Sequence, residues 1–86
     1  MAIEFSNHGL RQIEARNIAK GIILNIIEQP DKVLQQDKSI TIYTKLIDET
    51  EKHYLYRVIV NTAIEPNLII TAYKTSKIDK YGYSIR

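Results

Sequence analysis

The spacing of apolar residues changes once along this chain of 86 residues, and that change restricts the fold more than any other feature. Before Lys32 the apolar residues recur every three or four positions, which predicts amphipathic helices. From Lys32 onward they alternate with polar residues, which predicts strands. Two helices followed by strands predict an α+β fold in two layers, with an N-terminal helical hairpin packed on a four-stranded antiparallel sheet.

The boundaries of the predicted helices follow from capping residues. Residues 1–5 are a candidate short edge strand, and Ser6 predicts the N-cap of a helix over residues 6–16, because its hydroxyl can accept a hydrogen bond from a first-turn amide. Phe5 and Leu10 stand where a hydrophobic staple would place them. Asn17 predicts the cap of a second helix over residues 17–29, which ends before Pro30.

The second helix carries more apolar residues than one sheet face needs. At roughly 100° per residue, its apolar positions cover well over half of the helix circumference. They are Ile18, Ala19, Ile22, Ile23, Leu24, Ile26 and Ile27. We infer that this helix is buried on more than one side, or that a partner covers it.

Residues 32–75 predict the sheet, and residues 76–86 form a tail without clear periodicity. The expected strands are KVLQQD, SITIYTKLI, YLYRVIVN and LIITAYKT, separated by polar turns that include DETEK. A chain of this length predicts one domain, residues 1–86.

Alternation along the strands predicts which side chains share a sheet face. If the DETEK turn sets Ile47 opposite His53, then Tyr43 faces Arg57. The other face then pairs Ile42 with Val58 and receives the helices. The predicted polar face consists of Tyr43, Lys45, Arg57, Thr71, Tyr73 and Thr75.

This polar face has two interpretations. An arginine fork matches a phosphate, a lysine adds a point charge, and a tyrosine can stack on a base or bind a phosphate, so the set is typical of anion recognition. An exposed sheet face also carries such residues for solubility and cross-strand packing. From the strands alone, the second interpretation is favoured.

Three further residues are candidates outside the sheet. His8 falls in the first turn of its helix, where the dipole disfavours imidazolium, so a neutral ring could accept a proton. Arg16 and Lys77 could bind phosphates, although Arg16 would also suit a helix C-terminus without a ligand. With His8 and His53 at no metal-ligand spacing, we expect no metal site, and no motif indicates a cofactor.

The composition limits the remaining classes. There is no cysteine, which excludes disulfides and fits a reducing cytoplasm. A net charge of +2 permits nucleic-acid binding without indicating it. No apolar run approaches the roughly 20 residues that span a bilayer, and MAIEF is not typical of a signal peptide, so we expect a cytoplasmic protein.

Four stretches together resemble the bacterial and cyanobacterial domain-of-unknown-function family 4258. They are FSNHGLRQIEARNI, IIEQPDKV, YLYRVIVN and ITAYKTSKIDKY, and the resemblance extends over nearly the whole chain. The chain departs from the family pattern at Asn17, where the family usually has glycine. The resemblance extends to RelE-like and BrnT-like toxins within the barnase–RelE group, and it implies a RelE-like or barnase-like fold.

The resemblance also implies site residues and a partner. His8, Arg16 and Arg57 match recurring polar positions of the family, and Tyr73 with Thr75 matches its closing strand. In RelE-like enzymes, basic residues and a tyrosine on the open sheet face stabilise the phosphate and activate the 2′-hydroxyl, so Lys45, Arg57 and Tyr73 are candidates here. Family members often lie beside a small antitoxin-like gene, whose product would cover the second helix.

Three functions therefore compete. The first is a metal-independent endoribonuclease toxin, with His8 or Tyr73 as base and Arg57 and Lys45 stabilising the phosphorane. The second is a non-catalytic module that binds RNA or a protein partner through the same face. The third is a homo-oligomer that associates through the helix at Ile18–Ile27. The resemblance favours the first.

Overall fold

The computed structural model describes residues 2–50 and 52–77 of the chain. Its elements are β1 (Ile3–Phe5), α1 (Asn7–Ala15), α2 (Lys20–Glu28), β2 (Lys32–Gln35), β3 (Ile40–Glu49), β4 (Lys52–Asn61) and β5 (Asn67–Thr75). The predicted α+β order is confirmed. The predicted tail begins at residue 76, and its residues 78–86 lie outside the described residues.

The sheet has five strands in the order β1-β5-β4-β3-β2. The four antiparallel strands predicted within residues 32–75 are present as β2 to β5, and the candidate short strand within residues 1–5 is present as β1. The predicted four-stranded antiparallel sheet is corrected to a five-stranded mixed sheet, because β1 joins it by pairing with β5 in parallel. The amide of Asn67 donates to the carbonyl of Ala2, and the amide of Ser6 donates to that of Ile69, both at 2.9 Å. A three-residue strand that pairs in parallel with the last strand has no hairpin turn to mark it in the sequence.

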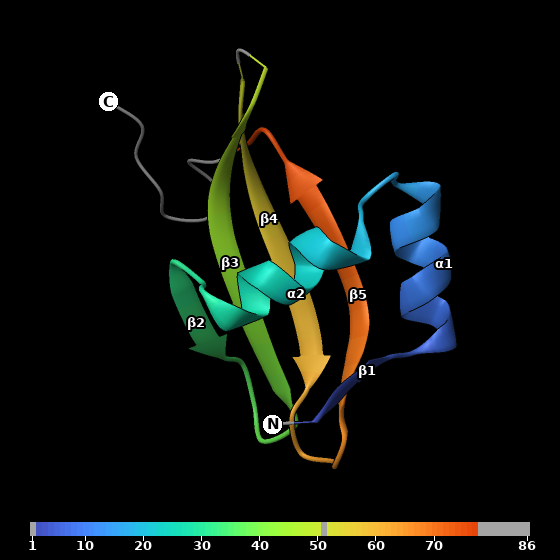
Figure 1. Ribbon diagram of the computed structural model, residues 1–86. Coiled ribbons are helices and arrows are strands. Elements are labelled where there is room, and N and C mark those ends of the chain that lie inside the picture. Colours follow the sequence, from blue (N-terminus) through green and yellow to red (C-terminus); the bar gives the residue numbers. More distant parts are fainter. Residues whose placement is uncertain (1, 51, 78–86) are drawn as a thin grey trace.

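The two helices take different places on the sheet (Figure 1). Helix α2 crosses one face of the sheet in front of β3 and β4, whereas α1 lies alongside β5. We call the side that α2 covers the helix face and the opposite side the far face. The buried cluster on the helix face joins Ile13, Ile18, Ile23 and Ile26 to Tyr56, Val58, Val60, Ile69 and Ala72.

The predicted start of α1 is confirmed, whereas the start of α2 is not. The amide of Gly9 donates to the Ser6 hydroxyl at 2.8 Å, which makes Ser6 the N-cap of α1. Helix α2 begins at Lys20, after Ala19, so Asn17 does not cap it. Asn17 instead has φ 60° in the turn between the helices. Glycine and asparagine adopt this left-handed conformation most readily, which accounts for an asparagine at this turn.

The register of the β3–β4 hairpin differs by one residue from the predicted register. Asp48 lies opposite His53 and Glu49 opposite Lys52, so the two strands run further into the DETEK segment than expected. Tyr43 therefore lies opposite Val58 on the helix face, and Ile42 lies opposite Ile59 on the far face. The predicted placement of Ile42 under the helices is wrong, because one residue of slip exchanges the two faces of a strand.

Helix α2 is covered by the sheet on one side only. Ile23 and Ile26 are fully buried, Ile22 and Ile27 are half-buried, and Leu24 is 42% exposed. Burial against the sheet accounts for these four isoleucines and leaves Leu24 uncovered.

Candidate functional site

One continuous row of polar residues crosses the far face through four strands. The strand registers place Lys32 of β2 opposite Thr44 of β3, Thr44 opposite Arg57 of β4, and Arg57 opposite Tyr73 of β5. Directly opposite residues point to the same face of a sheet, so the four side chains share the far face. We call Lys32, Thr44, Arg57 and Tyr73 the polar row; at about 4.8 Å between strands it spans roughly 14 Å.

Apolar rows flank the polar row on both sides. One consists of Leu34, Ile42 and Ile59 and ends at Thr71 of β5; the other consists of Leu46 and Leu55 and ends at Thr75. Ile42 is 5% exposed and Leu55 is 0% exposed, so the centre of the far face is well packed. Packed neighbours restrict the rotamers of the side chains in the polar row, and this holds the Arg57 guanidinium in a fixed place.

Arg57 and Tyr73 form the centre of this row. The Nη1 group of Arg57 donates to the Tyr73 hydroxyl at 2.7 Å, and the guanidinium carbon lies 5.9 Å from the centroid of the tyrosine ring. Both side chains are half-buried. A cation that donates to a phenol oxygen stabilises negative charge on that oxygen.

Arg16 lies at the edge of β5, next to the far-face residue Thr71. Its Nη1 group donates to the Thr71 hydroxyl at 3.2 Å and to the carbonyl of Ala72 at 2.9 Å. Pairing with β1 ends at Ile69, so Arg16 satisfies an edge carbonyl beyond that pairing. Two separately predicted candidates, Arg16 and Thr71, are thus in contact, and Arg16 also has a structural role at the edge of β5.

Two residues of the predicted polar face lie on the helix face instead. Tyr43 packs against the buried cluster, and Lys45 donates to the carbonyl of Gln29 at 2.7 Å, at the C-terminus of α2. A cation is favourable there because of the helix dipole. The prediction that Tyr43 and Lys45 share a face with Arg57 is therefore wrong, because it depended on the incorrect hairpin register.

The other predicted residues do not meet the Arg57–Tyr73 pair through any described contact. His8 is exposed in the first turn of α1. Thr75 lies on the far face, where its hydroxyl accepts from the amide of Lys77 at 3.0 Å. Lys77 is exposed just beyond β5.

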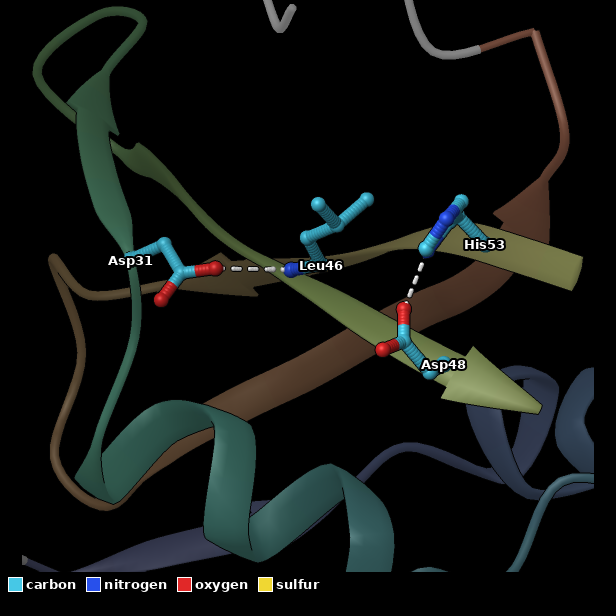
Figure 2. A network of polar contacts seen from close by, with 4 residues as sticks. All are labelled: Asp31, Leu46, Asp48 and His53. Carbon is cyan, nitrogen blue, oxygen red and sulfur yellow. Dashed lines mark hydrogen bonds and ion pairs between the residues drawn. The ribbon is translucent and has the colours of Figure 1, made fainter. Parts of the chain in front are cut away.

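Figure 2 shows two further polar contacts along β3. A carboxylate oxygen of Asp31 accepts from the amide of Leu46 at 2.8 Å, while the Asp31 amide donates to the carbonyl of Thr44 at the same distance. These bonds give the aspartate of the QPD stretch a structural role, because they fix the α2–β2 connection to β3. At the far end of the hairpin, the side chains of Asp48 and His53 form an exposed hydrogen bond.

Part of the polar row and a second polar cluster were not predicted from the sequence. Lys32 and Thr44 were missed because the face of β3 was inverted. On the helix face, Glu49 accepts from the Tyr56 hydroxyl and from Lys74, the latter at 2.7 Å, and the Lys74 ammonium lies 4.6 Å from the Tyr54 ring centroid. The correct β3–β4 register would have placed both groups of residues on their faces of the sheet. The second cluster satisfies its own polar groups.

Two further observations concern membrane-spanning helices and metal sites. Neither described helix is long and apolar enough to cross a membrane. Within residues 2–50 and 52–77, no three His, Asp or Glu side chains gather as potential ligands of a metal ion.

Comparison with known proteins identifies one relationship. A family model, described as Domain of unknown function (DUF4258), matches residues 5–74. No curated protein matches the chain, and no solved structure matches it. The matched segment begins at the last residue of β1 and ends one residue before the end of β5. It includes both helices and the whole polar row. Because the match extends over most of its length, the chain belongs to the family described as Domain of unknown function (DUF4258).

Proposed function

We propose that the chain binds single-stranded RNA at the polar row and cleaves it without a metal, as the toxin of a toxin–antitoxin pair would. The observation that carries the proposal is the 2.7 Å hydrogen bond from Arg57 to Tyr73, at the centre of a row that also contains Lys32. A guanidinium, an ammonium and hydroxyls along one line suit a phosphodiester backbone, and the tyrosine ring offers a surface on which a base can stack.

The chemistry assigned to the pair follows from its contact. Tyr73, as a phenolate stabilised by Arg57, takes the proton of a 2′-hydroxyl, whose oxygen attacks the adjacent phosphorus. The 5′-oxygen leaves and takes a proton from water, and a 2′,3′-cyclic phosphate remains. Arg57 stabilises the charge that develops on the phosphorane oxygens. Tyr73 is assigned as base in preference to His8, because Tyr73 contacts Arg57 directly.

Binding and cleavage are tested with four proteins in EDTA. The parent, Arg57→Met, Tyr73→Phe and the helix-face control Lys45→Met are checked for folding by circular dichroism and mixed with single-stranded RNA. We expect Arg57→Met to weaken binding and to reduce the slope of log affinity against log salt by about 0.7, the value for one phosphate contact on a single strand. Lys45→Met should leave that slope unchanged.

Cleavage separates the two residues further. Tyr73→Phe keeps the ring, so we expect RNA affinity to remain close to that of the parent while cleavage falls on the order of 10²–10⁴-fold, the usual contribution of a general base. A parent that neither binds nor cleaves RNA at any salt concentration tested would remove the proposal. Cleavage by Tyr73→Phe at the parent rate would remove the role of Tyr73.

A specific observation also favours a second candidate, an RNA-binding module without catalysis. His53 is the histidine of β4 and lies on the far face with Arg57. The two residues are four positions apart along the strand, which corresponds to about 13 Å at the usual rise per residue. His53 therefore lies too far from the Arg57–Tyr73 pair to protonate the leaving oxygen. Salt-dependent binding with intact RNA in every reaction would establish this candidate over the first.

A further inference from the structure

The flank of α2 that faces β1 combines an exposed leucine with a hollow. Leu24 is 42% exposed, and beside it lies a hollow of about 380 Å³ lined by Ile3, Leu24, Ile27 and Glu28. Three of the four lining residues are aliphatic, and the fourth supplies one carboxylate. This flank is separate from the polar row, which lies on the opposite side of the sheet.

The same flank carries a ridge with opposite charges at its two ends. Lys20, Leu24 and Glu28 are spaced by four residues, so they form one ridge along α2, with the leucine in the middle. The Lys20 ammonium lies 5.9 Å from the centroid of the Phe5 ring, which places it on the side of β1. Gly21 is exposed next to this ridge, and a Cβ built there would meet no atom within 4 Å.

A second copy of the chain complements this ridge. If two α2 helices pack antiparallel about Leu24, the Lys20 end of each ridge lies beside the Glu28 end of the other. Both ends of the contact then gain an opposite-charge pair, and each Leu24 lies against the hollow of the other copy. A two-fold interface requires such self-complementarity, because the same surface must fit itself. Gly21 leaves room for the second helix to approach closely.

We propose that two copies of this chain form a dimer through the α2 ridge, with the helices antiparallel and Leu24 at the centre. The arrangement buries the one large aliphatic side chain of α2 that the sheet leaves exposed, and it lies on the opposite side of the sheet from the polar row. The proposal does not depend on RNA binding.

Sedimentation at protein concentrations from about 1 µM to 1 mM tests the dimer. We expect the parent to dimerise with rising concentration and Leu24→Lys to raise the dissociation constant at least about tenfold, because it places a charge in an apolar contact. Ile64→Lys is the matched control: Ile64 is 46% exposed on the β4–β5 connection, and its replacement should change nothing. Leu24→Ala should weaken the dimer in the same direction, and circular dichroism checks the fold of each variant.

Charge reversal tests the antiparallel arrangement. Lys20→Glu places like charges beside each other at both ends and should weaken the dimer at least about fivefold, whereas the double variant Lys20→Glu with Glu28→Lys should restore it to within about twofold. The double variant also lacks the cation above the Phe5 ring. Recovery of dimer affinity would therefore report only the charge pairing between positions 20 and 28 of the two copies. A parent that stays monomeric at 1 mM, or a dimer indifferent to Leu24→Lys, would overturn the dimer. Failure of the double variant to recover would overturn the antiparallel arrangement.

Discussion

Replacement of Lys45 by methionine separates the two faces of the sheet in one experiment. In the structure the Lys45 ammonium donates to the carbonyl of Gln29 at 2.7 Å, at the end of α2. Methionine keeps the aliphatic stem but removes the charge and the donor. A cation near a helix C-terminus contributes about 0.3–1 kcal/mol at a surface position, and a charged donor adds a comparable amount in a partly exposed site. We therefore expect the free energy of unfolding to fall by about 1 kcal/mol.

Urea unfolding followed by circular dichroism measures this loss, and thermal unfolding should show a decrease in Tm of about 4–8 °C. RNA affinity and its salt dependence should match those of the parent, in contrast to Arg57→Met. The reasoning would be refuted by a Lys45→Met protein that is as stable as the parent and binds RNA with a smaller salt slope. That result would indicate that Lys45 lies on the same sheet face as Arg57.

Three other substitutions probe the local geometry, each by urea unfolding. Gly9→Ala should destabilise the protein by about 1–3 kcal/mol, because the added Cβ would lie 2.6 Å from the carbonyl oxygen of Ile69; unchanged stability would contradict the close approach of α1 to β5. Asn17→Val should cost about 1–2 kcal/mol more than Asn17→Gly, since φ is 60° there, and equal stabilities would argue against the left-handed turn. Asp31→Ala should cost about 1 kcal/mol and Asp31→Asn clearly less, because only alanine removes the acceptor for the Leu46 amide; equal losses would count against that bond.

Sequence alone predicted the elements and half of the site. The change of apolar period located the helices and four of the strands, and Ser6 predicted the first cap. On β4 and β5 the predicted parity was correct, so Arg57, Thr71, Tyr73 and Thr75 do share the far face. A parallel pairing such as that of β1 with β5 depends on contacts between residues more than sixty positions apart, which local patterns do not report.

The error on β3 has a local cause. The strands pair up to Glu49 and Lys52, and Thr50 takes a positive φ of 46°. Tight hairpin turns use such a conformation, and asparagine or glycine normally marks it. Threonine is β-branched and seldom adopts it, so the DETEK segment resembles a longer polar loop. The turn was therefore placed one residue early, and this moved Tyr43 and Lys45 to the wrong face.

The central claim is that the polar row of the far face is an RNA-binding site, and NMR titration tests it most directly. A ¹⁵N-labelled sample is titrated with a short single-stranded RNA while amide shifts are followed. We predict that the largest shifts fall at Lys32, Thr44, Arg57 and Tyr73, whereas Leu24 on α2 remains unaffected. Shifts concentrated on α2, or no shifts at RNA concentrations well above that of the protein, would contradict the claim.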